Sequence, residues 1–221
     1  MVLKKFIWFY LKPHGNQKVY IVTLVTMIKM IKKLKKSKVI ELNEAYQKTL
    51  HWFFCFPERE IGLNDLSEAL KISKTTAKRI VLQLMEEGFL KREIIGKLWR
   101  ISCNQNHQYN TIRKVPYNLA LIYNTYILEK IHEKIRNPKA VILFGSYRKG
   151  DDNEKSDIDI AVEVVGNEDV KIIELGVVGE LGYRKNVPIN LYVFSRNKVD
   201  INLFSNIENG IVLEGLLEVR P

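Results

Sequence analysis

Two aspartates in the C-terminal half of the sequence have the spacing of a metal site. Asp157 and Asp159 are separated by one residue, and Ile158 and Ile160 alternate with them. Successive side chains of a β-strand point to opposite faces, so both carboxylates would lie on one face, about 7 Å apart at Cα. Two carboxylates at that distance can converge on one hard divalent cation.

A glycine–serine pair precedes these aspartates. Gly145 and Ser146 follow the apolar run 140–144, which predicts a buried strand, and ten residues separate Ser146 from Asp157. A turn at this pair would present backbone N–H groups and a hydroxyl to an anion such as a polyphosphate. A divalent cation between the turn and the aspartates would then bridge the carboxylates to the phosphates of a nucleotide.

The neighbouring residues predict a small sheet with helices that would position these groups. We expect strands over 140–144, 157–164 and 187–194, a helix over 170–183 and a closing helix over 202–213. The polar spacer between the first two strands would carry the chain from one half of the site to the other.

A long helix is expected before the first strand, over residues 112–136, because apolar residues recur there near helical spacing. Pro116 would mark its first turn, and Asn137-Pro138 would end it. We expect this helix to pack on the sheet or to pair with a second subunit in a homodimer.

This arrangement resembles the nucleotidyltransferase superfamily, whose signature is a hydrophobic strand, Gly-Ser, a spacer and Asp-hydrophobic-Asp-hydrophobic. With Gly150 and Ser156 in the spacer, the sequence is most similar to the minimal nucleotidyltransferases of bacteria and archaea. The resemblance implies an α+β fold in which residues 138–221 form a small mixed-sheet core. It also implies transfer of a nucleoside monophosphate from a nucleoside triphosphate, ATP being the expected one, with Mg²⁺ or Mn²⁺.

The resemblance assigns roles to individual residues. Asp157 and Asp159 would hold the metal ion, and Asn190 stands where active members of the family carry a third, catalytic acid. The residues implied to contact the nucleotide phosphates are Gly145, Ser146, Arg148, Lys149 and Ser156.

Two departures from the family pattern leave the activity open. Asn190 cannot take a proton from a hydroxyl and is a poorer metal ligand than a carboxylate, although its carbonyl oxygen can hold a cation weakly. Lys149 replaces the family's usual arginine and so loses the planar bidentate fork while keeping the charge. Slow transfer and nucleotide binding without transfer both remain possible outcomes.

No other acid is expected to replace the third carboxylate. Glu163 faces the same way as the aspartates but lies about 13 Å further along the strand. The remaining acids, Asp151, Asp152 and Glu154, lie in a spacer that we expect to be mobile, and none of them is assigned to the site.

Residues 40–104 resemble a winged helix-turn-helix. We expect helices over 44–54, 66–70 and 74–87, followed by a hairpin around Gly96. In that resemblance the third helix enters a DNA major groove and the hairpin is the wing. The implied DNA contacts are Lys74, Thr75, Thr76, Lys78, Arg79, Lys97 and Arg100. Such folds also serve as packing or dimerisation modules, so DNA binding and a scaffold role both stay open.

The net charge of +10 is concentrated in a lysine-rich N-terminal extension, residues 1–39, which contains no acidic residue. Its apolar run 19–28 is shorter than the ~20 residues that a membrane-spanning helix needs. The extension is a basic arm, a solvated helix face or an artefact of a misplaced start codon, with Met27 or Met30 as the true start. These alternatives stay open.

Four segments follow from these patterns: the extension, the helix-turn-helix (40–104), a linker with the long helix (105–137) and the nucleotidyltransferase domain (138–221). Cys55 and Cys103 lie far apart and the four histidines form no cluster, so we expect no zinc site. We predict a cytoplasmic protein without a membrane partner.

Two functions compete. The first is an enzyme that transfers a nucleoside monophosphate to a hydroxyl of a protein or an RNA. The second is a catalytically inactive DNA-binding regulator or antitoxin-like protein whose core binds a nucleotide or a partner such as a toxin. The aspartate pair favours the enzyme, whereas Asn190 and the helix-turn-helix favour the regulator.

Overall fold

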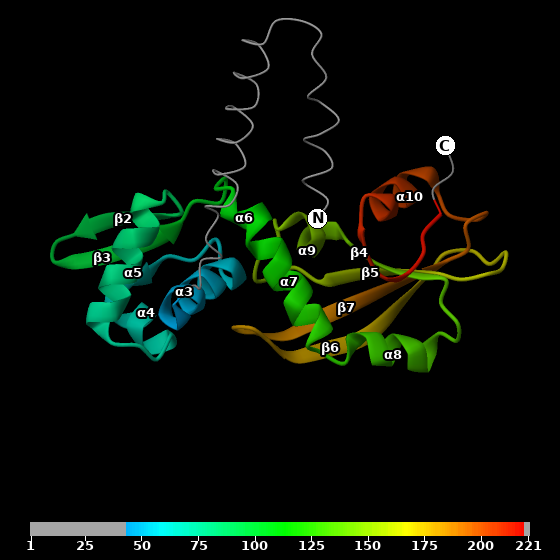
Figure 1. The fold of residues 1–221 in the computed structure, drawn as a ribbon, viewed down its shortest axis with the longest axis horizontal. Helices are drawn as coiled ribbons and strands as arrows, with labels where there is room; N and C mark the ends of the chain where they lie inside the picture. The colour runs from blue at the N-terminus through cyan, green and yellow to red at the C-terminus, as the bar shows by residue number, and fades with distance from the viewer. Residues whose placement is uncertain (1–42, 219–221) are drawn as a thin grey trace, which may run out of the picture. The chain divides into compact units, whose positions relative to one another are not determined.

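The structure is a computed structural model that describes residues 43–218 of the chain. The expectations for residues 1–39 lie outside the described residues. Helices surround a five-stranded mixed sheet and a separate three-stranded sheet in the described part, which is consistent with the expected α+β class (Figure 1). Within residues 43–218, no helix has both the length and the apolar character needed to cross a membrane.

Residues 43–103 form three helices and the three-stranded sheet, in which the last strand lies between the other two. The elements are α3 (Glu44–Cys55), β1 (Ile61–Gly62), α4 (Leu63–Ala69), α5 (Lys74–Glu86), β2 (Leu90–Ile95) and β3 (Leu98–Cys103). The side chains of Asn43 and Ser73 accept hydrogen bonds from first-turn N–H groups and cap α3 and α5. The second helix starts earlier than the expected residue 66, and β1 was not expected.

The five-stranded sheet is the core of the C-terminal half. Its strands are β4 (Ala140–Phe144), β5 (Ile158–Glu163), β6 (Lys171–Leu181), β7 (Arg184–Phe194) and β8 (Ile211–Gly215), arranged in the order β6-β7-β5-β4-β8. β5 and β7 pair in parallel, and the other neighbours are antiparallel.

The prediction of a helix over 170–183 is wrong, because strand β6 occupies most of this segment. β6 pairs with β7 in an antiparallel hairpin that turns between Leu181 and Arg184. The segment is rich in β-branched residues, which favour a strand, and contains Gly176 and Gly179, which disfavour a helix. Pairing with β7 supplies the backbone hydrogen bonds that a helix would otherwise have made internally.

The closing helix expected over 202–213 is also wrong in its second half. Helix α10 (Ile201–Glu208) ends early, and the chain adds β8 to the edge of the sheet beside β4. Gly210 lies at the change of direction, where an added Cβ would come 2.4 Å from the Ile142 side chain. The close passage over β4 therefore requires a residue without a side chain.

The long helix expected over 112–136 is broken into three pieces. They are α6 (Tyr109–Ile112), α7 (Lys114–Tyr123) and α8 (Ile127–Lys134). Pro116 lies in the first turn of α7, where its missing N–H is not needed. The break between α7 and α8 turns the chain so that buried Ile127 and Ile131 of α8 reach the sheet core.

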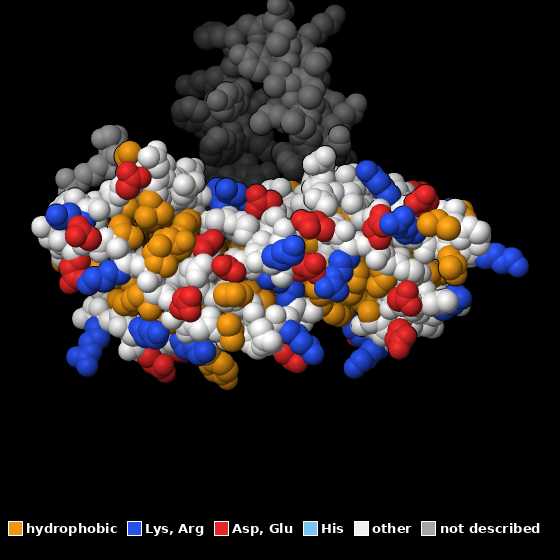
Figure 2. All heavy atoms as spheres, turned by 180° about the vertical axis from the view of Figure 1, so that it is seen from behind, with side chains coloured by type: hydrophobic (Ala, Val, Ile, Leu, Met, Phe, Trp, Pro, Cys, Tyr) orange, Lys and Arg blue, Asp and Glu red, His pale blue; other side chains and the backbone are white. Residues whose placement is uncertain are grey.

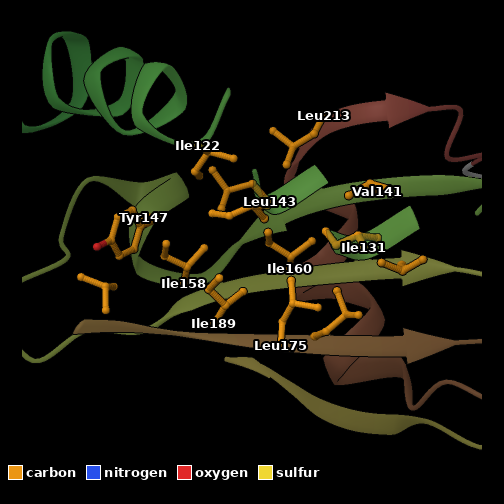
Figure 3. Close-up of a cluster of buried hydrophobic side chains, with 14 of the residues drawn as sticks. Ile122, Ile131, Val141, Leu143, Tyr147, Ile158, Ile160, Leu175, Ile189 and Leu213 are labelled. Atoms are coloured by element: carbon orange, nitrogen blue, oxygen red, sulfur yellow. The ribbon is translucent and has the colours of Figure 1, made fainter. Parts of the chain in front are cut away.

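Both faces of the sheet are covered, by different helices. Figure 3 shows Ile122 of α7 and Ile131 of α8 among sheet side chains that include Ile158 and Ile160. The opposite face carries Ile142, Phe144 and Ala161, and Ile207 of α10 packs against it. Because side chains alternate along β5, its aspartates lie on the α10 side of the sheet.

Candidate functional site

Asp157 and Asp159 lie at the start of β5, on the face that α10 partly covers. Ile158 and Ile160 are fully buried in the opposite direction, as expected from the alternation, whereas both aspartates are half-exposed. The parallel pairing of β5 with β7 puts Asp159 directly opposite Asn190. Three polar side chains from two neighbouring strands therefore meet at one place, and solvent can reach it.

The amide of Asn190 lies between the two carboxylates. Its Nδ2 donates to Asp157 Oδ2 at 3.2 Å and to Asp159 Oδ1 at 3.4 Å. Two carboxylate oxygens thus converge on one NH₂ group, whose hydrogens carry positive partial charge, and a bound cation would need the same convergence. For Asn190 to become a ligand itself, its amide has to turn so that the carbonyl oxygen replaces the nitrogen.

The two aspartates suit a hard divalent ion that takes its remaining ligands from water and a substrate. No cluster of three or more His, Cys, Asp or Glu side chains suited to a metal occurs within residues 43–218. Mg²⁺ typically takes one or two protein carboxylates and completes its octahedron with water and substrate phosphates. The pair of aspartates matches this mode of binding.

The site disfavours additional negative charge. Burial raises the pKa of the Asp159 carboxyl, the hydrogen bond from Asn190 opposes this, and the charge of Asp157 raises it further. Burial, followed by the charges of Asp159 and Asp157, also raises the pKa of Tyr192 on the same face. A cation bound between the carboxylates would relieve this repulsion.

Gly145 allows the segment after β4 to approach the carboxylates. Its φ of +70° lies in the left-handed region, and an added Cβ would be 2.6 Å from Asp159 Oδ2. The expected open turn at Gly145-Ser146 is in fact the start of a short helix, α9 (Gly145–Lys149). Gly150 ends this helix at φ +80° and packs so tightly that a Cβ would meet the Asn110 carbonyl.

The other residues expected to contact phosphate are only partly brought together. Arg148 and Lys149 line a pocket of about 260 Å³ together with Gly145. Ser146 is half-exposed in the first turn of α9. Ser156, by contrast, is engaged within the spacer, where its hydroxyl accepts from the Asn153 backbone N–H at 2.9 Å and donates to Asn153 Oδ1 at 3.3 Å.

The spacer is held by a buried polar network that we did not anticipate. Asp152 is only 3% exposed and forms a 3.2 Å ion pair with Lys114, which is 1% exposed. Asn118 donates to Asp152 Oδ1 at 2.8 Å and to the Tyr147 carbonyl at 3.0 Å. Far from being free to swing into the site, Asp152 ties the spacer to α7. Burial raises the pKa of its carboxyl, and the Lys114 charge opposes this.

A second buried contact fixes α9 and the spacer to β7. Arg184 donates to the Tyr147 hydroxyl, to the Glu154 carbonyl at 3.1 Å and to the Ser156 carbonyl at 2.5 Å. One feature of the sequence could have predicted the contacts of Lys114 and Asn118. Lys114 and Asn118 lie one turn apart on the face of α7 that also carries buried Ile122, and polar groups on a buried face require partners.

The remaining acid of β5, Glu163, lies at the far end of the strand from the aspartates. It is 2% exposed and pairs with Lys139 at 3.4 Å and with Arg196 at 3.2 Å. Glu163 therefore forms ion pairs of its own and takes no part in the aspartate site.

The residues expected to contact DNA lie at different places. Lys74, Lys78 and Lys97 line one pocket of about 470 Å³ formed by α5, the start of α4 and the β2–β3 hairpin, and the acidic Asp65 lines it as well. Thr75 and Arg79 are exposed on α5 outside this pocket. On the face shown in Figure 2, basic and acidic side chains of the described residues are interspersed.

Two of these residues have partners that reduce their availability to DNA. Arg100 is paired with Glu60 and, at 3.7 Å, with Glu93, so its charge is already compensated. The Thr76 hydroxyl is hydrogen-bonded to the capping residue Ser73 at 2.8 Å.

Comparison with known proteins bears on the C-terminal half. Residues 127–214 match the family model described as Polymerase beta, Nucleotidyltransferase. The matched range contains α8, the strands from β4 to β7 and both aspartates. This core has a nucleotidyltransferase-type fold. No protein in the curated collection matches the chain. The match does not include the helices and hairpin of residues 43–103.

The buried pair of Lys114 and Asp152 gives a first prediction. Lys114→Met should lower the free energy of unfolding by roughly 3–5 kcal/mol, because it leaves the Asp152 charge buried without an opposite charge beside it. Urea denaturation measures the change. The double variant Lys114→Met, Asp152→Asn removes that charge and keeps an acceptor for Asn118, so it should recover part of the loss. Equal losses in both variants would contradict this account.

The raised pKa of Asp159 gives a second prediction. The folded protein retains this proton at pH values where the unfolded chain has lost it, so ionisation of Asp159 lowers stability as the pH rises above the ordinary value of 3.8. Asp159→Asn should therefore raise the free energy of unfolding at pH 7 by roughly 0.5–2 kcal/mol.

The gain should disappear at pH values below 3.8, where the carboxyl is protonated in both states. Denaturation curves at several pH values test this, with Asp151→Asn at an exposed spacer position as the control. A pH-independent gain would point to packing instead of charge.

Proposed function

We propose that this protein transfers a nucleoside monophosphate from a nucleoside triphosphate to a hydroxyl of a protein or an RNA. The observation that carries the proposal is the convergence of Asp157 and Asp159 on one point beside the Gly145 turn, in a core of nucleotidyltransferase type. Arg148 and Lys149 lie close by and offer positive charge to the triphosphate.

The aspartates would hold Mg²⁺, or Mn²⁺, with ATP as the expected nucleotide. The ion would neutralise charge on the phosphates. Gly145 keeps the phosphate loop in close approach to Asp159, and the bound phosphates would face Arg148 and Lys149. Fixed positive groups of this kind stabilise the charge that develops on the departing pyrophosphate.

The reaction balances as a substitution at the α-phosphorus. The acceptor oxygen forms a bond to that phosphorus while the bond to the bridging oxygen breaks, and pyrophosphate leaves. The acceptor hydroxyl loses its proton, which Asn190 cannot take because an amide is not a base at neutral pH. The proton then passes to water, and we expect transfer to be slow for that reason.

Asn190→Asp tests this reasoning. The new carboxylate would supply the base and a third metal ligand, so the transfer rate should rise roughly 10²-fold or more. It would also crowd three carboxylates together, so the variant should be less stable than the wild type without Mg²⁺ and should gain more from adding it.

Label transfer from α-labelled ATP, CTP, GTP and UTP, with a cell extract as the acceptor source, measures the rate. Thermal unfolding with and without Mg²⁺ measures the stability. The double variant Asp157→Ala, Asp159→Ala is the negative control. An unchanged rate together with a Mg²⁺-dependent gain in stability would show that Asn190 is not what limits the chemistry.

A second candidate function is DNA binding, with the core as a nucleotide- or partner-binding module. The observation that favours it is the pocket between α5 and the hairpin, which gathers Lys74, Lys78 and Lys97. We propose that residues 43–103 act as a winged helix-turn-helix with α5 as the recognition helix. In this case the protein is a regulator, or an antitoxin-like protein with a toxin as partner.

Substitution of two lysines tests DNA binding. Lys74→Ala, Lys78→Ala should weaken binding to short duplexes and reduce the slope of log affinity against log salt by about one per lysine lost. Fluorescence anisotropy at several salt concentrations measures both quantities. Arg100→Ala is the matched control and should have a smaller effect, because Glu60 and Glu93 already compensate its charge. The absence of binding by the wild type would favour the scaffold role.

A further inference from the structure

The pocket beside Gly145 has two chemically different ends. Arg148 and Lys149 of α9 supply positive charge, and Asn206 and Asn209 of α10 supply amides. Gly145 lines the same pocket and is the residue that approaches Asp159, so the pocket adjoins the aspartate pair. Neither asparagine was part of the expected site.

The hydrogen bonds of the two asparagines fix the orientation of their amides. Asn206 Nδ2 donates to the Asn202 carbonyl at 3.0 Å, and Asn209 Nδ2 donates to the Ser205 carbonyl at 2.7 Å. A backbone carbonyl can only accept, so the nitrogen of each amide has to face the helix. The oxygen of each amide is turned away from that bond and remains as an acceptor.

Two neighbouring acceptors suit a group with two N–H donors. Asn206 lies in the last turn of α10 and Asn209 is its C-cap, so their side chains are neighbours, with Cβ atoms about 5–6 Å apart for residues three apart on a helix. A planar amino group with two hydrogen bonds of about 2.9 Å at 120° needs acceptors about 5 Å apart. Amide oxygens also repel phosphate, so the triphosphate belongs at the Arg148–Lys149 end and the nucleoside at the other.

We propose that Asn206 and Asn209 are specificity-determining residues that accept hydrogen bonds from the exocyclic amino group of the nucleotide's base. This rests on the proposed nucleotide binding and deepens it, because it predicts that ATP is preferred over inosine triphosphate, which has a carbonyl where ATP has the amino group. The carbonyl would place an acceptor against two acceptors, so both hydrogen bonds would be lost. Because Asn206 and Asn209 are exposed in the structure, the discrimination expected is that of these two hydrogen bonds.

The experiment is a comparison of nucleotide affinities by calorimetry in the presence of Mg²⁺. We expect wild type to bind ATP about 10-fold or more tightly than inosine triphosphate, since two hydrogen bonds are lost. Asn206→Ala, Asn209→Ala should weaken ATP binding to a similar extent and should not weaken the binding of inosine triphosphate. Asn202→Ala, on the same helix but outside the pocket, is the matched control.

The outcomes separate this inference from the proposed function. If wild type binds neither nucleotide, both fail. If it binds ATP and loses it in Asp157→Ala, Asp159→Ala but not in Asn206→Ala, Asn209→Ala, only the inference fails. A further measurement uses deoxy-ATP. If the asparagine variant binds ATP and deoxy-ATP equally but still binds ATP more tightly than inosine triphosphate, the asparagines contact the ribose. The proposed contact to the amino group is then wrong.

Discussion

The parallel pairing of β5 with β7 is the constraint on which the site depends. It places Asp159 opposite Asn190, and strand alternation puts Asp157 on the same face while Ile158 and Ile160 fill the core. A slip of one residue in this register would bury the carboxylates and expose the isoleucines. The hydrophobic core therefore fixes the position of the polar site as well as the stability of the sheet.

The second requirement is that the segment between β4 and β5 keeps one conformation. Its length and polar composition are typical of a mobile loop, but the Lys114–Asp152 pair and the Arg184 guanidinium hold it from two sides. Lys114 lies on the helix that follows residues 43–103, and Arg59 of that part also pairs with Glu154 in the spacer. Residues 43–103 and α7 are thus joined to the spacer by two ion pairs. The Lys114–Asp152 pair is buried, and the Arg59–Glu154 pair lies at the surface.

Asn190 holds the two aspartates together through its amide. Its amide nitrogen offsets the repulsion between two partly buried carboxylates, which a third carboxylate would increase. The same amide cannot act as a base. Under the proposed function, the residue would stabilise the folded protein without a metal ion and would slow the transfer reaction, a trade-off common at functional sites.

The sequence by itself determined the carboxylate pair, the strands on either side of the spacer and the need for glycine after the first of them, because strand alternation and glycine's conformational freedom are local properties. It did not determine whether residues 170–183 are helix or strand, since the pairing of β6 with β7 is decided by a partner in another part of the chain. Only the tertiary structure revealed the buried partner of Lys114 and brought Asn206 and Asn209 to the pocket beside Gly145. Contacts between residues distant in sequence leave little trace in local patterns, and these contacts shape the site around its two aspartates.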